Sequence, residues 1–314
     1  MTTPLVVEAR DLKRFYGDRA ALAGVSFDVR AGEIFGFLGP NGGGKTTLLR
    51  VLATLLPPSS GSATVFGLDV ARDPNAVRRR IGVVFQSKHV DGKLTAAENL
   101  RHHGHLYGLR GGELTDRIQQ SLTRFGLLDR AKDLVETFSG GLRRRLELAK
   151  GLLHQPGLLL LDEPTTGLDP GARRDLWDYL GRLRGQDNLT VVLSTHLLDE
   201  AERCDRLAIL HQGQIVSTGS PDALKSEIGG EVILVETPDP DLILAQLKQR
   251  FAVEAAVVGG KVRFEHARGH EFIPQLVEAF PGEIQSAMVS KPTLEDVFLH
   301  RTGHQFWEET ALRG

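Results

Sequence analysis

Four short stretches of the chain are almost wholly apolar, and each has the length of a β-strand. They are Ile34–Leu38, Ile81–Phe85, Gly157–Asp162 and Thr190–His196. A strand with one face in water alternates apolar and polar residues, so unbroken apolar runs predict strands buried on both faces, as in a parallel sheet. Segments with helical spacing, such as Leu48–Leu56, lie between them. This alternation of strands and helices is typical of an α/β fold.

Two other regions follow different patterns. Within residues 5–30, Val25, Phe27 and Val29 alternate with polar residues, which predicts half-buried antiparallel strands. Residues 95–150 have mainly helical spacing, and Thr95 with Glu98 forms a capping-box signature at the start of a helix. The first part of the chain therefore combines an antiparallel β region, a buried sheet and a helical region.

A pair of glycines, Gly229 and Gly230, marks the expected domain boundary. We expect a first domain over residues 1–228, with its helical part at about 87–155, and a second over residues 231–314. The second shows strands and helices in the order βαββαβ, with a two-residue hairpin at Gly259–Gly260. It is predicted to be a small α+β domain without a catalytic constellation.

Composition narrows the class of protein. The 314 residues are 41% hydrophobic and 25% charged with a net charge of -2, so no global field attracts nucleic acid or an anionic membrane. The single cysteine, Cys204, excludes an intrachain disulfide and is expected to pack in the core. No run of about 18 apolar residues is present, and the charged amino terminus does not resemble a signal peptide. If the protein acts on a membrane, another chain is expected to supply the membrane-spanning helices.

The segment from Gly39 to Thr47 fits the phosphate-binding pattern G-x-x-x-x-G-K-[ST] and lies between a predicted strand and a predicted helix. Its glycines let the backbone curl around phosphate oxygens, and the following helix directs its positive end at them. Lys45 is predicted to bridge the β- and γ-phosphates, and the Thr46 hydroxyl to bind Mg²⁺. The nucleotide-binding residues of this loop are Gly39, Pro40, Asn41, Gly42, Gly43, Gly44, Lys45, Thr46 and Thr47.

Polar side chains follow three of the buried strands. Asp162 is predicted to hold Mg²⁺, and Glu163 to orient the attacking water and accept its proton. His196 shares the same carboxyl edge, where a γ-phosphate contact is favoured over a structural role. Gln86 also ends a strand, although a solvated glutamine is the simpler interpretation. Tyr16 precedes the phosphate loop and is either a base-stacking ring or an ordinary half-buried aromatic.

A second small-residue loop, Ser139–Gly141, stands before a helical run and predicts a second anion site. The economical hypothesis is that it meets the nucleotide bound to another copy of the chain. The triplet Arg143–Arg145 is weak support for nucleic-acid binding in a near-neutral chain. His102, His103 and His105 are spaced poorly for a common metal ion, so a polar surface is preferred.

In this order, these motifs resemble an ATP-binding cassette of the ABC ATPases over about residues 5–225. The resemblance implies a P-loop NTPase core with an antiparallel β subdomain and a helical subdomain, working as a head-to-tail pair that binds ATP and Mg²⁺. It implies that Tyr16 stacks on adenine, Gln86 senses the metal and γ-phosphate, Glu163 is the general base and His196 the γ-phosphate switch. The loop at Asp169 and Ser139–Gly141 would complete nucleotide binding. No N-K-x-D motif supports a GTPase.

Two features resemble one subgroup of that family. Leu142 followed by arginines stands where glutamine is usual after Ser-Gly-Gly, as in the ABC-2 subgroup, and Gly43 replaces the more usual alanine or serine. The tail Pro292–Gly303 is similar to that of daunorubicin-resistance-type exporter ATPases. The resemblance implies an exporter ATPase at the cytoplasmic face of the membrane, bound to a separate ABC-2 permease, with residues 95–110 as a candidate docking surface. The alternative is a soluble, non-transport cassette ATPase acting on the ribosome or DNA.

Overall fold

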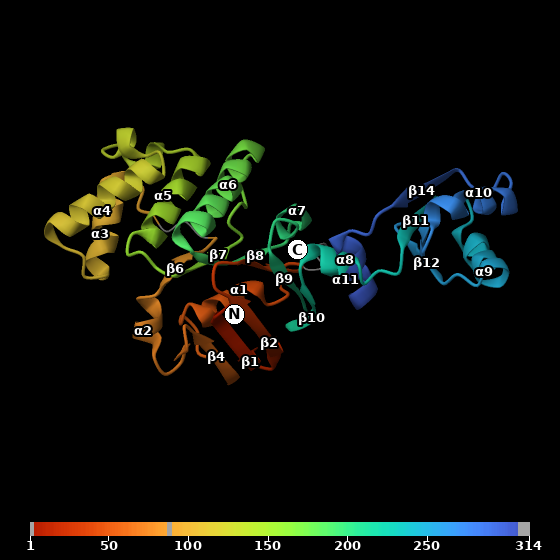
Figure 1. Ribbon diagram of the computed structural model, residues 1–314, viewed down its shortest axis with the longest axis horizontal. Coiled ribbons are helices and arrows are strands. Elements are labelled where there is room, and N and C mark those ends of the chain that lie inside the picture. The colour runs from red at the N-terminus through yellow and green to blue at the C-terminus, as the bar shows by residue number, and fades with distance from the viewer. Residues whose placement is uncertain (1–2, 87–89, 307–314) are drawn as a thin grey trace. The chain divides into compact units, whose positions relative to one another are not determined.

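The computed structural model describes residues 3–86 and 90–306, apart from the side chains of Gln186 and Asp187. Its contacts divide the chain into two compact units, Met1–Val216 and Ser217–Gly314, which are coloured red to green and green to blue in Figure 1. This division falls before the glycine pair at 229–230, and the domain boundary drawn there stays a prediction.

The predicted buried sheet lies in the first unit, apart from the last residues of its edge strand, which pass the division at Val216. Its six strands lie in the order β10-β9-β3-β8-β7-β6, and β3 pairs in parallel with both β8 and β9, as β7 does with β6 and β8. The strands are β3 (Ile34–Leu38), β6 (Ile81–Val84), β7 (Leu158–Asp162), β8 (Thr190–Thr195), β9 (Arg206–His211) and β10 (Gln214–Gly219).

Alternate residues of these strands enter two different apolar clusters, so the sheet is buried on both faces. In β7, Leu158 and Leu160 belong to one cluster, whereas Leu159 and Leu161 belong to the other. Cys204 is buried in the second cluster, and burial raises the pKa of its thiol well above the ordinary range. The prediction of a buried parallel sheet from unbroken apolar runs is confirmed.

The first cluster lies between the parallel sheet and a second, antiparallel sheet. The strands of that sheet follow the order β2-β1-β4-β5, with the bounds β1 (Leu5–Tyr16), β2 (Arg19–Arg30), β4 (Ser60–Val65) and β5 (Leu68–Asp69). Helix α1 (Lys45–Leu52) contacts β2 and β4 of this sheet and β7 and β8 of the other (Figure 1). The phosphate loop therefore enters a helix that is fixed by both sheets.

Helices cover the second cluster. Figure 1 shows α3, α4 and α5 gathered together, with α6 beside α5. Thr95 caps α3 with the predicted capping box, in which its side chain accepts from Glu98 N and the Glu98 carboxylate accepts from Thr95 N. Besides α1, the helical segments of this unit are α2 (Pro74–Arg78), α3 (Ala96–Leu106), α4 (Gly111–Arg124), η1 (Leu128–Arg130), η2 (Val135–Thr137), α5 (Gly140–Leu152), α6 (Pro170–Asp187) and α7 (Leu198–Ala201).

The second unit has the predicted βαββαβ order around a four-stranded antiparallel sheet, β12-β13-β11-β14. Gly259 and Gly260 join β12 to β13 with φ angles of 56° and 78°, which suits a two-residue hairpin. Its elements are α8 (Pro221–Lys225), β11 (Glu231–Glu236), α9 (Pro240–Phe251), β12 (Ala255–Val258), β13 (Lys261–His266), α10 (Gly269–Ala279), β14 (Ser286–Ser290) and α11 (Leu294–Thr302). Within the described part of the chain, no helix is long and apolar enough to cross a membrane.

The helical region meets the parallel sheet at a pair of glycines. A Cβ placed on Gly82 in β6 would lie 2.2 Å from the backbone oxygen of Gly151 in α5, and 3.1 Å from Pro156 Cγ. Such a separation is far below van der Waals contact, so only glycine permits this approach of helix and strand. Because β6 ends two residues before Gln86, this contact helps to set the position of a predicted site residue.

Replacing this glycine should therefore be costly. We expect Gly82→Ala to lower the melting temperature, by the equivalent of about 1–3 kcal/mol of overpacking. Gly181→Ala is the matched control, because Gly181 is exposed in α6 and its added Cβ would meet no atom within 4 Å beyond the adjacent backbone of its own helix. It should raise stability by up to about 1 kcal/mol through helix propensity. Thermal denaturation followed by circular dichroism gives both values, and a stable Gly82→Ala protein would refute the close approach.

Candidate active site

The predicted phosphate loop joins the end of β3 to the first turn of α1. Gly42 and Gly44 have φ angles of 78° and 107°, in the left-handed region that residues with side chains rarely adopt. A Cβ on Gly39 would lie 2.1 Å from the backbone oxygen of Leu210 in β9. The glycines thus permit a tight curl of the backbone, which is the form that a phosphate-binding loop requires.

Gly43 also has a local reason to be glycine. Its N–H donates to the backbone oxygen of Pro40 over 3.2 Å, which closes the turn of the loop. A Cβ there would stand 3.1 Å from that same oxygen and 3.3 Å from the backbone oxygen of Leu210. The loop is therefore tight at the position where the resemblance implies alanine or serine.

Lys45, the first residue of α1, is only 4% exposed. Its Nζ donates to the backbone oxygens of Gly39 over 2.7 Å and Pro40 over 3.0 Å. Burial lowers the pKa of Lys45 below its ordinary value, and the carboxylates of Glu163 and Asp162 offset only part of this shift. A buried ammonium bonded mainly to neutral carbonyls fits a phosphate group, whose negative oxygens supply the opposite charge.

Asp162 ends β7 and is 2% exposed. Two hydroxyl groups donate to its Oδ1, Thr46 Oγ1 over 3.1 Å and Ser194 Oγ over 2.5 Å. Carboxylate and hydroxyl oxygens are the ligand type that Mg²⁺ prefers, so Thr46 and Asp162 fit the predicted metal role. Ser194 was missed as a site residue, although its place at the end of the neighbouring strand was the available signal.

The carboxylate of Glu163 is where the predicted catalytic residues meet. Gln86 Nε2 donates to Oε2 over 3.3 Å, and Thr166 Oγ1 donates to the same oxygen over 3.2 Å. Lys45 Nζ lies 3.8 Å from Oε1. His196 Nδ1 lies 3.1 Å from Oε1, at ion-pair distance but without hydrogen-bond alignment. The three predicted catalytic residues Lys45, Gln86 and His196 therefore converge on the Glu163 carboxylate.

Two properties of Glu163 follow from these surroundings. Burial by itself would raise the pKa of Glu163, but His196, Lys45 and the hydrogen bond from Thr166 together outweigh burial and hold the pKa below its ordinary value. The carboxylate is therefore ionised at neutral pH and able to accept a proton. The backbone of Glu163 has a φ of 46°, a strained value for this residue, and its N–H donates to Ser194 Oγ over 3.0 Å.

A cavity of about 400 Å³ lies over the phosphate loop, within the usual size range of small-molecule sites. Tyr16 stands at its edge with 43% of its surface exposed, and the Arg14 guanidinium lies 5.2 Å from its ring centroid. Arg19 was missed by the sequence reasoning; its Nη2 donates to Gly42 O over 3.4 Å. The lining residues are Tyr16, Arg19, Ala21, Asn41, Gly42, Gly44, Lys45, Thr46, Thr47, Gln86 and Glu163.

The second small-residue loop is not part of this cavity. Ser139 caps α5 by accepting a hydrogen bond from Leu142 N over 3.4 Å, and Asp169 caps α6 by accepting from Ala172 N over 2.9 Å. None of the residues in Ser139–Gly141, nor Asp169, lines the cavity over the phosphate loop. The side chain of Leu142 packs partly against the apolar cluster of the helical region. A single chain thus brings together the predicted nucleotide contacts around the phosphate loop, whereas Ser139–Gly141 and Asp169 lie outside this cavity.

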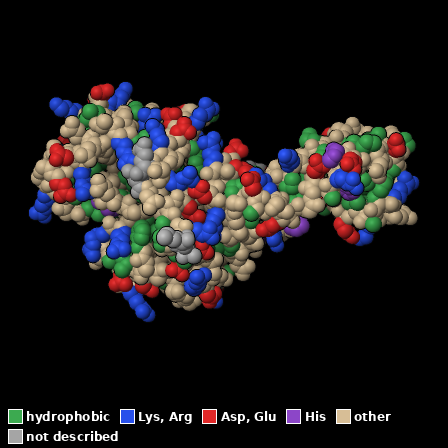
Figure 2. Space-filling model, in the orientation of Figure 1, with side chains coloured by type: hydrophobic (Ala, Val, Ile, Leu, Met, Phe, Trp, Pro, Cys, Tyr) green, Lys and Arg blue, Asp and Glu red, His purple; other side chains and the backbone are tan. Residues whose placement is uncertain are grey.

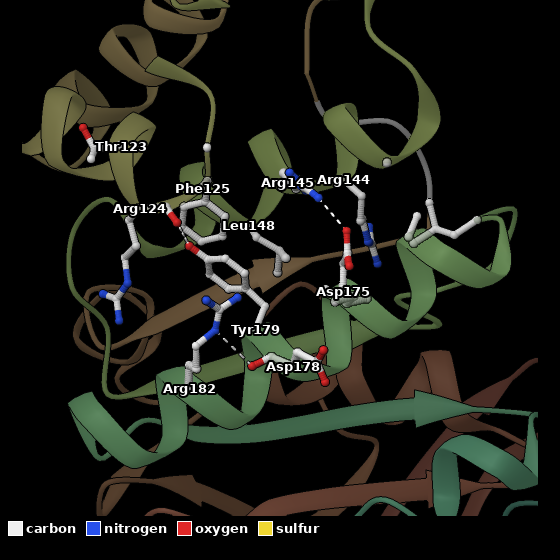
Figure 3. A pocket seen from close by; sticks show the side chains of 15 residues that line it. Thr123, Arg124, Phe125, Arg144, Arg145, Leu148, Asp175, Asp178, Tyr179 and Arg182 are labelled. Atoms are coloured by element: carbon white, nitrogen blue, oxygen red, sulfur yellow. Dashed lines mark hydrogen bonds and ion pairs between the residues drawn. The ribbon is translucent and has the colours of Figure 1, made fainter. Parts of the chain in front are cut away.

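A separate cavity of about 350 Å³ lies between the end of α4, α5 and α6 (Figure 3). Its wall includes Phe125 and Tyr179, whose rings stack with centroids 4.6 Å apart. Arg145 Nη2 and Asp175 Oδ2 form an ion pair of 2.7 Å across it. Gly141 is its single lining residue among those predicted to bind nucleotide, so this cavity is distinct from the one over the phosphate loop.

The histidines on α3 separate in the structure. His103 is half-buried near Tyr107 and His154, whereas His102 and His105 are exposed. Burial lowers the pKa of His103 to about 3, helped by Lys150 and His154, so this ring is neutral. Among the described residues, no three His, Cys, Asp or Glu side chains are grouped to hold a metal ion.

Known proteins with this arrangement were found by both sequence and structure. Residues 22–166 match the ABC transporter family. The daunorubicin/doxorubicin resistance ATP-binding protein of Streptomyces peucetius is 38% identical over 307 residues, 95% of this chain and 92% of the relative. The Nod factor export ATP-binding protein I of Rhizobium sp. is 37% identical over 303 residues, 96% of this chain and 98% of the relative.

A solved structure supports the same comparison. The dimeric, post-hydrolysis state of an ATP-binding cassette bound to ADP and Pi superimposes with a TM-score of 0.62 at 27% sequence identity. The match covers 68% of this chain and 98% of the solved one. The likeness therefore concerns the first unit and most of a complete cassette.

The geometry around Glu163 generates a prediction. We expect Glu163→Gln to keep nucleotide affinity, because the amide preserves the size of the side chain, and to lower turnover by about 10²–10⁴-fold through loss of the base. Asp178→Asn is the control, because it changes a carboxylate to an amide on the exposed face of α6. Phosphate release and equilibrium binding of a fluorescent ATP analogue give the two quantities. Turnover equal to the parent in Glu163→Gln would show that another group is the base.

Proposed function

Since this chain belongs to the family of ABC transporter ATP-binding proteins and is an ATPase, we propose that it powers export through a separate ABC-2 type membrane permease. The observation that carries the proposal is the convergence of Lys45, Gln86 and His196 on Glu163, with Ser139 outside that site. The relatives with near-complete coverage act in drug resistance and in Nod factor export, which supports export over import.

We propose the following roles for the residues over the loop. Tyr16 stacks on the adenine, and the loop N–H groups with Lys45 hold the triphosphate. Thr46, Asp162 and Gln86 hold Mg²⁺, which when bound neutralises charge on the phosphates. Glu163 accepts a proton from the attacking water, and His196 contacts the γ-phosphate end. In-line attack on the γ-phosphate then depends on positioning and charge more than on covalent chemistry.

The missing contacts come from a second copy of the chain. We infer a head-to-tail pair in which Ser139–Gly141 of one copy, with the amino terminus of α5, faces the nucleotide held by Lys45 of the other. The loop at Asp169 would lie at the same junction. The separation of Ser139–Gly141 from the cavity over the loop supports this arrangement. Closure of the pair around ATP is then the motion that drives the permease.

Export requires a membrane partner, and we propose that the chain works at the cytoplasmic face of the membrane as a peripheral subunit. Helix α3 is the candidate docking element, because Leu106 near its end is 83% exposed, an unusual state for a leucine. Binding of nucleic acid is not expected. Figure 2 shows acidic and basic side chains interspersed over the visible face, and the net charge is -2. The non-transport alternative, acting on ribosome or DNA, is therefore disfavoured.

A composite site predicts complementation between two inactive chains. Lys45→Ala and Ser139→Arg should each abolish activity in a pair of identical chains. Mixing them leaves one intact site in each mixed pair, so ATPase activity should return to roughly a quarter of the unsubstituted level if chains exchange freely. A mixture of Lys45→Ala with the double variant Lys45→Ala/Ser139→Arg is the control and contains no intact site. A phosphate-release assay with no recovery in the first mixture would argue against the shared site.

The proposed permease leads to a second test. The tagged chain, purified from detergent-solubilised cells that make it naturally, should carry a polytopic membrane protein in a fixed ratio. Leu106→Asp should remove that protein while leaving basal ATPase activity intact, because it places a charge on the proposed docking face. Leu55→Asp is the control at another exposed leucine, one with 56% of its surface exposed. Copurification with ribosomes in place of a membrane protein would favour the alternative function.

A further inference from the structure

Arg144 is an arginine of the basic triplet at the start of α5, yet its side chain is only 9% exposed. Its Nε donates to the backbone oxygen of Pro164 over 2.7 Å, and its Nη1 donates to the backbone oxygen of Phe85 over 3.2 Å. Pro164 immediately follows Glu163, and Phe85 immediately precedes Gln86. One guanidinium group therefore holds the backbone beside both residues.

The position of that guanidinium is itself fixed. Glu147 lies three residues further along α5, and its Oε2 accepts from Arg144 Nη1 over 2.8 Å. Both side chains are buried, so the pair is shielded from water and screened little by salt. A planar guanidinium presents several donors in a rigid fork, which a lysine cannot do. The arrangement thus transmits the position of α5 to two separate backbone segments.

The two segments end on side chains that touch each other. Gln86 Nε2 donates to Glu163 Oε2 over 3.3 Å, a contact that a shift of either backbone would break. Glu163 also has the strained φ of 46°, which persists only where the surroundings hold it. The hydrogen bond from Arg144 to the Pro164 carbonyl therefore restrains the residue that directly follows Glu163.

We propose that Arg144 is a positioning residue for hydrolysis, which aligns Glu163 and Gln86 of its own chain from the helix that carries Ser139. The assignment rests on the proposed ATPase site, because it concerns the same carboxylate. A positioning role for Arg144 can be distinguished from a purely structural one. A residue that only links α5 to the sheet affects folding stability, whereas a positioning residue affects the rate of the chemical step at unchanged substrate affinity.

The first test separates these two roles with a conservative variant. Arg144→Lys keeps a cation beside Glu147 and so avoids an unpaired buried carboxylate, but one ammonium cannot hold both carbonyls. We expect kcat to fall at least about tenfold, with KM and the melting temperature close to those of the parent. Arg145→Lys is the matched control, because Arg145 is the next residue and pairs with exposed Asp175 (Figure 3). It should leave kcat unchanged.

A fall in melting temperature of Arg144→Lys with unaltered kcat would overturn the positioning role. A loss confined to KM would do the same, because substrate binding would then be the affected step.

The second test uses the complementing pair of Lys45→Ala and Ser139→Arg chains. Its intact site uses Glu163 of the Ser139→Arg chain, so Arg144→Lys in that chain should lower the recovered activity at least about tenfold. The same change in the Lys45→Ala chain should lower it less than about twofold, since Glu163 of that chain is idle. Equal effects in the two chains would refute the positioning role alone. Failure of the parent pair to complement would refute the shared site instead.

Discussion

The parallel registration of neighbouring strands is the constraint on which the whole site depends. Leu38 of β3 pairs with Thr195 of β8, and Asp162 of β7 pairs with Ser194 of the same strand. Because these strands run in one direction, their carboxyl ends meet at one edge and deliver the phosphate loop, Glu163 and His196 together. A shift of one residue in any pairing would turn these side chains to the opposite face of the sheet. Burial on both faces makes such a shift expensive, so the same apolar residues fix both stability and catalytic geometry.

A second feature of the site is that its central residue is held under strain. Glu163 occupies a left-handed backbone conformation directly after a fully buried strand. Hydrogen bonds from its own N–H to Ser194 and from Arg144 to the next carbonyl restrain the turn on both sides. At this turn the Glu163 carboxylate lies 3.8 Å from Lys45 Nζ. The conformational energy stored there is balanced by the packing of the two sheets and α1.

Much of the fold could be predicted from the sequence because its signals are local. Unbroken apolar runs identified the parallel strands, and polar residues at their ends identified Asp162, Glu163 and His196. The phosphate loop was visible because its glycines are required by backbone geometry at fixed spacing. The fold class and the ATPase activity that these signals predict are confirmed by the family match, the relatives and the solved structures. The individual roles of the site residues remain predictions.

Contacts between distant segments could not be predicted in the same way. Arg144 lies in a basic triplet, and exposed arginines are the ordinary expectation for such a run. Its burial depends on carbonyls that lie 20 and 59 residues away in sequence. Arg19 was missed for the same reason, since its guanidinium meets the Gly42 carbonyl only when the strands assemble, whereas Ser194 had a signal in its place at a strand end. Patterns within one strand or helix can be predicted from the sequence, whereas contacts between side chains of different elements become known only from the structure.

The depressed pKa of Glu163 has a chemical consequence for the end of the catalytic cycle. His196, Lys45 and Thr166 favour the charged form of this side chain, and the same preference favours release of any proton that it accepts. The proposed base would therefore regain its negative charge readily after a proton transfer, and the contacts that position the carboxylate would also restore it.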